Sequence, residues 1–321
     1  MNCSPFIISI FASFFFTSNT AADGVWETFP KLSGCHAGQH VDGVSKLKHY
    51  FQHFGYITNN PKNPSDDFDE DLESAIKTYQ LNFNLETTGT LDDPTLKQLE
   101  RPRCGVADVI NGSTSMNAGK GGTPPPRSLP HANIHTVARY SFFSGARRWT
   151  DLTYAFLPEN NLTHSVKSLF SRSFDRWSAV IPLTFNQTTS YSGADIKIGI
   201  FRGDHGDGTP FDGAGGVLGH AFAPPDGRFH LDGDEEWAMD GGNLNATSYD
   251  METVVMHEIG HVLGLAHSSD AAAVMYPSVE AGTRKVELGN DDVEGIQELY
   301  GSNPNYKRVE PTPRYWLVCE A

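Results

Sequence analysis

Residues 257–267 read His257-Glu258-Ile259-Gly260-His261-Val262-Leu263-Gly264-Leu265-Ala266-His267. Residues four apart share one face of an α-helix, so this spacing predicts that His257 and His261 can bind one metal ion. Glu258 follows the first histidine, where its carboxylate can reach a water at that ion without becoming a ligand. Gly264 can end the helix in a left-handed turn and return His267 as a third nitrogen. Three imidazoles with an open fourth position are typical of catalytic rather than structural zinc.

The residues around this segment strengthen the interpretation. An ordinary helix with surface histidines is the alternative, but the acid, the glycine and the third histidine at these spacings argue against it. Met275 lies eight residues beyond His267, in Val274-Met275-Tyr276-Pro277. The buried surface of the predicted helix comes from its apolar residues, which are Val254, Val255, Ile259, Val262 and Leu263.

Length and composition limit the class of protein. The chain has 321 residues, enough for about two domains. Its net charge of −15 disfavours a general binder of nucleic acid or anionic membranes. With 20% charged and 38% hydrophobic residues, it reads as a soluble globular protein. Four cysteines exclude a disulfide-dense scaffold, whereas 13 histidines favour metal chemistry.

The two ends of the chain carry targeting information. Residues 1–22 contain an apolar stretch, Phe6 to Phe16, followed by small residues, which predicts a cleaved secretory signal peptide. A buried core helix is the alternative. No later segment is apolar enough for a membrane span, and we expect residues 305–321 to form a polar tail. Four glycosylation sequons suit a secreted surface, at Asn111, Asn161, Asn186 and Asn245.

Between these ends the sequence divides into two folded parts. Helical apolar spacing around 44–54 and 72–83, and a capped start at Asp92-Asp93-Pro94, predict a small three-helix domain. The Gly- and Pro-rich stretch from Asn111 to Pro130 predicts a flexible linker open to proteases. A second domain follows from about Tyr140, with strands near 152–157, 183–188 and 194–201, a helix near 166–180, a Gly-rich loop region and two further helices. This order indicates an α+β fold.

The histidine segment resembles the metzincin signature, and its surroundings resemble the matrixins, the matrix metalloproteinases. Pro102-Arg103-Cys104-Gly105-Val106-Ala107-Asp108 is similar to the cysteine switch of that family, and Tyr300 to Asn305 resembles its plant members. The resemblance covers about Cys35 to Asn305, and a hemopexin-like domain is not expected. It implies a metzincin-type catalytic domain, with a twisted, mostly parallel five-stranded sheet and three helices, after a three-helix, peptidoglycan-binding-like prodomain. The resulting division is a signal peptide at 1–22, a propeptide at 23–110, a linker with the activation cleavage at 111–140, a catalytic domain at 141–304 and a tail at 305–321.

The resemblance also implies roles for individual residues. Zinc on the three histidines activates water, Glu258 is the general base, and Met275 packs beneath the metal in a Met-turn. A structural zinc is expected on a second set of ligands, which are His205, Asp207, His220 and His230. A calcium ion is expected on carboxylates and carbonyls of Asp212, Gly213, Gly215, Val217, Asp232 and Glu235. Solvated acids at a turn are the alternative for this last set.

Latency is expected to depend on Cys104, which would occupy the open zinc position in the zymogen. Arg103 and Asp108 would pair to fix the loop, while Ala107 stands where the family commonly has proline, which predicts a looser loop. A disulfide between Cys35 and Cys104 is the alternative in an oxidising compartment.

The function predicted from the sequence is a secreted zinc endopeptidase that cleaves extracellular proteins or peptides after an activating protease, or autocatalysis, removes the propeptide. A glycan-binding protein with a vestigial metal site is one rival, and a metzincin with a different target is another. By the resemblance, the specificity pocket lies around Val254 and Tyr276 to Val279.

Overall fold

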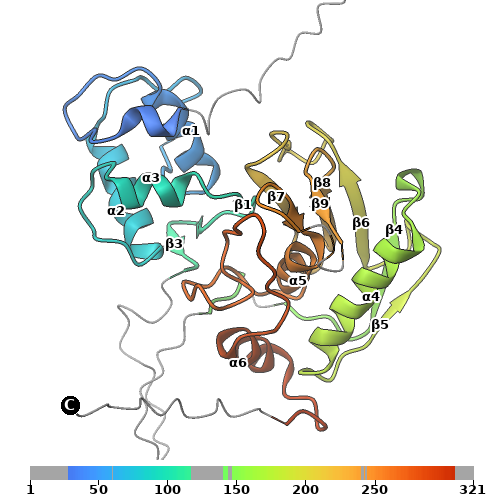
Figure 1. Cartoon of the computed structure of the whole chain (residues 1–321). Helices are drawn as coiled ribbons and strands as arrows, with labels where there is room; N and C mark the ends of the chain where they lie inside the picture. The colour runs from blue at the N-terminus through green and yellow to red at the C-terminus, as the bar shows by residue number, and fades with distance from the viewer. Residues whose placement is uncertain are drawn as a thin grey trace, which may run out of the picture.

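A computed structural model describes residues 28–59, 61–116, 140–143, 147–239, 242 and 244–307. The predicted signal peptide, most of the predicted linker and the last 14 residues lie outside these ranges. Figure 1 shows two parts of the molecule. The first consists mainly of the blue and cyan helices, which lie beside one edge of the sheet that forms the second part. No helix in the described ranges is long and apolar enough to cross a membrane.

The first part is the predicted three-helix domain. A short 3-10 turn, Phe29–Leu32, precedes α1 (Val44–His53), α2 (Glu70–Asn82) and α3 (Asp93–Leu99). Asp69 and Asp92 cap α2 and α3, because each side chain accepts a hydrogen bond from the backbone N–H three residues on. Aromatic and aliphatic residues fill the core between the helices, with Tyr79 and Phe51 fully buried. The same apolar cluster includes Val217 and Tyr276 of the second part, so the two parts share one packed boundary.

The second part is built on a six-stranded sheet in the order β1-β7-β8-β6-β4-β5. Its strands are β1 (Arg103–Cys104), β4 (Leu152–Phe156), β5 (Phe185–Gln187), β6 (Ile196–Phe201), β7 (Val217–Ala221) and β8 (Arg228–Asp232). All neighbouring pairs are parallel except β7 with β8. Strands β4 to β8 are therefore the expected five, and β1, from the segment predicted to be the propeptide, adds the sixth along the edge of β7 (Figure 1).

Three helices accompany this sheet in the described part of the chain, as expected. They are α4 (His164–Ser178), which packs against α5 (Met251–Val262), and α6 (Asn290–Tyr300). A short 3-10 turn (Pro158–Asn160) and a small parallel pair, β9 (Trp237–Ala238) with β10 (Tyr249–Asp250), complete the part. Every residue of α5 is buried, and the helix packs on β7 and β8. A helix buried on all sides holds its polar side chains in fixed positions, which is what a metal site requires.

The structure differs from the sequence-based expectation in two places. Strands β7 and β8 occupy the stretch that was expected to be a Gly-rich loop region. A hairpin of β2 (Val109–Ile110) and β3 (Ser113–Thr114) extends into the segment that was expected to be a linker. Met116, just after β3, is fully buried. Residues 114–116 therefore pack against the prodomain, whereas residues 111–113 are exposed.

Candidate metal centre and its propeptide cover

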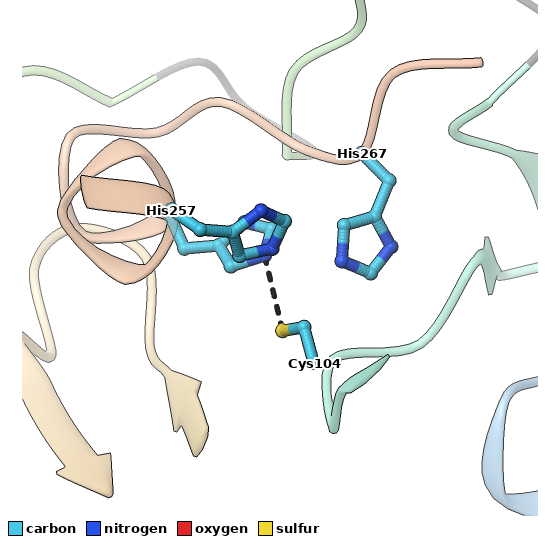
Figure 2. A group of neighbouring side chains, drawn as sticks. Cys104, His257 and His267 are labelled. Carbon is cyan, nitrogen blue, oxygen red and sulfur yellow. Dashed lines mark hydrogen bonds between the residues drawn. The ribbon is translucent and has the colours of Figure 1, made fainter. Parts of the chain in front are cut away.

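The two histidines of α5 lie on one helix face, next to the third. The ring centroids of His257 and His261 are 4.7 Å apart, and that of His267 lies 5.3 Å and 4.8 Å from them. Figure 2 shows the rings of His257 and His267 facing each other, with Cys104 approaching from the propeptide. The ligand atoms of the three histidines and the Cys104 sulfur all lie within 4.8 Å of one another. The structure thus brings together the four residues that the sequence assigned to one centre.

Hydrogen bonds orient each imidazole. The Nδ1 atoms of His257 and His261 lie 2.7 Å and 2.8 Å from the carbonyl oxygens of Val274 and Leu265. A carbonyl can only accept, so these Nδ1 atoms carry the proton and Nε2 keeps its lone pair. Burial lowers the pKa of both histidines well below the usual value, so the rings are neutral, as metal ligands must be.

The turn after α5 returns the third histidine. Gly264 has a φ of +106°, a left-handed conformation that side chains disfavour, and the N–H of Leu265 donates to the carbonyl of Gly260. Met275 packs directly against α5 at Gly260, where an added Cβ would lie 2.2 Å from the methionine sulfur. The carboxylate of Asp292 holds the methionine segment by accepting bonds from two successive N–H groups, those of Val274 and Met275. Met275 is buried, and its sulfur lies against α5 as a packing group.

Several buried polar atoms at this centre lack a partner. They are Nε2 of His257, Nε2 of His267 and both carboxylate oxygens of Glu258. Burying a polar atom without a partner lowers the stability of the fold. A divalent cation bound by these converging nitrogen atoms would supply the missing partner. Glu258 is fully buried, and burial raises its pKa to about 8 before any cation is bound. The donor set therefore fits zinc.

Cys104 covers this centre from the propeptide. Its sulfur lies 3.4 Å from Nε2 of His261, and its backbone N–H donates to the carbonyl of Pro277. On the other side of the strand, the N–H groups of Arg103 and Gly105 donate to the carbonyls of Gly216 and Gly219. Residues 102–105 thus fill a groove between β7 and segment 277–279, with backbone bonds to both walls. Cys35 lies in the prodomain core and both cysteines are free, so the alternative Cys35–Cys104 disulfide is wrong.

A buried ion pair fixes this loop. The guanidinium of Arg103 donates to Asp108 at 2.7 Å, and both side chains are at most 1% exposed. The guanidinium also lies 3.7 Å from the Phe54 ring centroid, and the Tyr56 hydroxyl donates to Asp108. Asp108 accepts a further bond from Nδ1 of His267 at 2.8 Å. Sequence reasoning missed this last contact, which joins the propeptide to the third histidine across 159 positions.

The second expected ligand set also converges. One Asp207 oxygen lies 2.8–3.0 Å from ring nitrogens of His205, His220 and His230, and all four ligand atoms lie within 4.8 Å. Burial lowers the pKa of His220 and His230 to about 4, so both rings are neutral at pH 7. Three nitrogens and a carboxylate with no open position match a closed structural zinc site.

The expected calcium set forms a looser acidic cluster in the same region. Gly215 N–H donates to Glu235, and Val217 N–H donates to Asp212. Asp232 is buried with one oxygen unpartnered. Burial, together with neighbouring acids, raises the pKa of Asp232 to about 6 and that of Glu235 to about 8. In the described ranges these carboxylates do not converge within 4.8 Å as the two histidine sets do.

The remaining predicted sites lie at the surface or at the groove wall. All four sequon asparagines are exposed, Asn111, Asn161, Asn186 and Asn245. Tyr276, Ser278 and Val279 line a cavity next to the propeptide strand. The residue of α5 that lines this cavity is Thr253, one residue before the predicted Val254. Cys319, the predicted signal peptide and most of segment 111–140, in which the activation cleavage is predicted, lie outside the described residues.

Comparisons with known proteins agree with this geometry. The family model described as Matrixin matches residues 146–301, and the one described as Putative peptidoglycan binding domain matches residues 40–99. Metalloendoproteinase 5-MMP of Arabidopsis thaliana is 53% identical over 89% of this chain and 78% of its own length. Metalloendoproteinase 2-MMP of the same plant is 48% identical over 96% and 85%. Human Matrilysin is 35% identical over 84% of this chain and 92% of its own length.

Proposed function

The chain belongs to the matrixin family of zinc metalloendopeptidases, of the plant type, and we propose that it is a secreted zymogen kept latent by Cys104. The single observation that carries this proposal is the sulfur of Cys104, 3.4 Å from Nε2 of His261 among three neutral imidazoles. In the proposed latent state the thiolate is the fourth zinc ligand, which leaves no position for water.

In the activated enzyme, the three histidines would hold the catalytic zinc. When bound, this ion supplies Lewis-acid activation of water and of the scissile carbonyl. Glu258 accepts the proton of the attacking water and delivers it to the leaving amine. The groove that now holds residues 102–105 would receive the substrate backbone, because its walls offer backbone donors and acceptors along both sides. Met275 and the partners of the Nδ1 atoms keep the ligands in place.

Two further metal sites would support the loop before β7. The set of His205, Asp207, His220 and His230 would hold a structural zinc, since it is closed and buried. Calcium would bind at Asp212, Asp232 and Glu235 with carbonyls of Gly213, Gly215 and Val217, where a cation would offset the cost of burying Asp232 and Glu235. Both ions would stiffen the edge on which the propeptide strand pairs.

The domain division predicted from the sequence completes the proposal. A signal peptide at 1–22 would direct secretion to the extracellular space or cell wall, and glycans would attach at the exposed sequons. A cut within 111–140, by another protease or by autocatalysis, would release the propeptide and the Cys104 ligand. The substrates would be extracellular proteins or peptides.

Peptide hydrolysis with and without chelator tests the function. We expect the processed protein to cleave fluorogenic peptides, to lose this activity with 1,10-phenanthroline at roughly millimolar concentration, and to regain it with added zinc, because the nucleophile depends on the ion. A protein that binds glycan but cleaves no peptide after processing would instead support the glycan-binding alternative.

Replacing Asp108 with asparagine should weaken latency. The substitution leaves the buried Arg103 guanidinium without its carboxylate, a change that costs about 3–5 kcal/mol in typical buried pairs. We expect thiol reagents to modify Cys104 of the zymogen at least about tenfold faster. Asp69→Asn is the matched control, because it removes a prodomain carboxylate that bonds Lys48 and the Leu72 N–H instead of Arg103. Equal thiol reactivity in the two variants would contradict the proposed role of the Arg103–Asp108 ion pair in latency.

A further inference from the structure

A continuous chain of hydrogen bonds runs from the third histidine of the metal centre to hairpin β2–β3. Its first link is the bond at 2.8 Å between Nδ1 of His267 and Oδ1 of Asp108. The other carboxylate oxygen, Oδ2, accepts a bond from the hydroxyl of Tyr56, also at 2.8 Å. The amide nitrogen of Asn82 donates to that hydroxyl at 3.0 Å, and the amide oxygen accepts the Thr114 hydroxyl at 2.9 Å. A residue of β3 is therefore joined to a predicted zinc ligand through side chains alone.

Each member of this chain has a fixed role as donor or acceptor. The Thr114 hydroxyl accepts from the backbone N–H two residues on, which leaves its only proton for Asn82. Burial and the nearby Asp108 charge raise the pKa of Tyr56 well above its usual value, so the phenol keeps the proton that it donates. Burial alone would raise the pKa of Asp108, but the Arg103 guanidinium outweighs it and holds this pKa well below its usual range. The carboxylate is therefore charged, and bonds that all point toward it strengthen one another.

The bond from Tyr56 determines where the two oxygens of Asp108 point. Oδ1 alone accepts both the Arg103 guanidinium, at 2.7 Å, and His267. Because the terminal torsion of an aspartate is broad, a donor on Oδ2 is what keeps Oδ1 turned toward these two groups. Ser115 fixes the backbone of the same residue, since its N–H and its hydroxyl both donate to the Asp108 carbonyl, at 2.8 Å and 3.0 Å. The hairpin thus holds Asp108 by its side chain and by its main chain.

We propose that hairpin β2–β3 is a second latch of the zymogen, in addition to the contact of Cys104 with the metal centre. Three side chains outside the cysteine-switch loop, those of Thr114, Asn82 and Tyr56, act in it as positioning residues. They hold Asp108 in the orientation that keeps the loop closed over the centre. The inference rests on the proposed latency and names residues that regulate it. Since the latch ends where the predicted linker begins, it connects the linker to the centre.

The test measures how fast iodoacetamide modifies two buried cysteines of the uncut zymogen, by mass spectrometry of their peptides. Cys104 reports on the latch, and Cys35, in the helical core of the prodomain, reports on unfolding of that core. In Tyr56→Phe we expect the Cys104 rate to rise about tenfold, because a hydrogen bond to a charged group is lost. In Thr114→Val we expect a rise of about threefold, because the lost bond joins neutral groups. The Cys35 rate should stay unchanged in both variants.

Matched variants separate positioning from a purely structural role. Tyr79→Phe removes a hydroxyl that is buried in the same core and that has no hydrogen-bond partner among the described residues. Thr78→Val removes a hydroxyl that bonds only within α2. Both should leave the Cys104 rate unchanged, and so should Thr114→Ser, which keeps the hydroxyl of the chain. Equal acceleration of Cys35 and Cys104 in Tyr56→Phe would show that the core itself has loosened, and it would overturn the proposal.

A double variant tests whether the bonds act as one chain. If Thr114 acts through Tyr56, the variant with both changes should have a Cys104 rate about tenfold above normal, as Tyr56→Phe alone does. A rise of about 30-fold, the product expected for independent effects, would overturn the proposal. If Tyr56→Phe does not fold, Thr114→Val on the partly exposed hairpin decides, and an unchanged Cys104 rate overturns the latch. Cys104 of the unaltered zymogen reacting as fast as in the unfolded chain would instead contradict the proposed latency itself.

Discussion

Glu258→Gln is expected to lower kcat/KM for peptide hydrolysis by about 10³-fold, within the range of about 10²–10⁴ that general acid–base catalysis typically contributes. Glutamine has the size of glutamate but cannot accept the water proton. Both Glu258 oxygens are buried and unpartnered in the latent structure, so the carboxylate is available to a water in the groove once Cys104 has left. The measurement is steady-state cleavage of a fluorogenic peptide by the processed variant.

Zinc content separates this role from a structural one. Glu258 does not belong to the converging ligand set, so Glu258→Gln should retain as much zinc as the unaltered protein. The control is Glu287→Gln, which removes an exposed carboxylate bonded to Arg176 and should leave kcat/KM unchanged. Near-normal turnover by Glu258→Gln would refute its assignment as the general base.

Cys104→Ser is expected to convert the uncut full-length chain from an inactive into an active peptidase, with a rise in activity of about 100-fold over the unaltered zymogen. A neutral serine hydroxyl is a far weaker zinc ligand than a thiolate, so the fourth position opens to water. The backbone bonds of residues 102–105 to both groove walls remain, so activity should stay below that of the processed enzyme. The comparison uses equal amounts of each uncut protein, with chain length checked by electrophoresis.

Cys35→Ser provides the matched control for this experiment. Cys35 is also a buried free cysteine of the prodomain, but it packs in the helical core. Its serine variant should stay latent while unprocessed. If Cys104→Ser were as inactive as Cys35→Ser, occlusion of the groove alone would explain latency and the thiol would have no role.

The parts of the fold that follow local patterns could be predicted from the sequence. The prodomain helices and α4 show helical apolar spacing, and α5 is marked by its histidines and by Gly264. Strands β7 and β8 escaped prediction because His220 and His230 occupy positions that apolar residues would normally take, among many glycines. Hairpin β2–β3 carried a usable signal: Asn111-Gly112 is a typical two-residue hairpin turn, and both residues have positive φ.

The ligand sets of the candidate sites could be predicted, but their neighbours could not. The spacing of His257, His261 and His267 on one helix and turn is a local property. In contrast, the bond from His267 to Asp108 and the pair of Arg101 with Glu280 join residues more than 150 positions apart. β1 is only two residues long and is a strand because β7 offers it an edge. Such contacts depend on how the two parts pack, which no spacing in the sequence records.

The most direct test of the central claim is the zinc environment before and after processing, measured by metal content and X-ray absorption spectroscopy on the same preparation. We predict two zinc ions per chain in both forms, with a sulfur ligand at one of them in the zymogen and none after the propeptide is removed. A zymogen without zinc–sulfur scattering, or a processed enzyme that keeps it, would contradict the account.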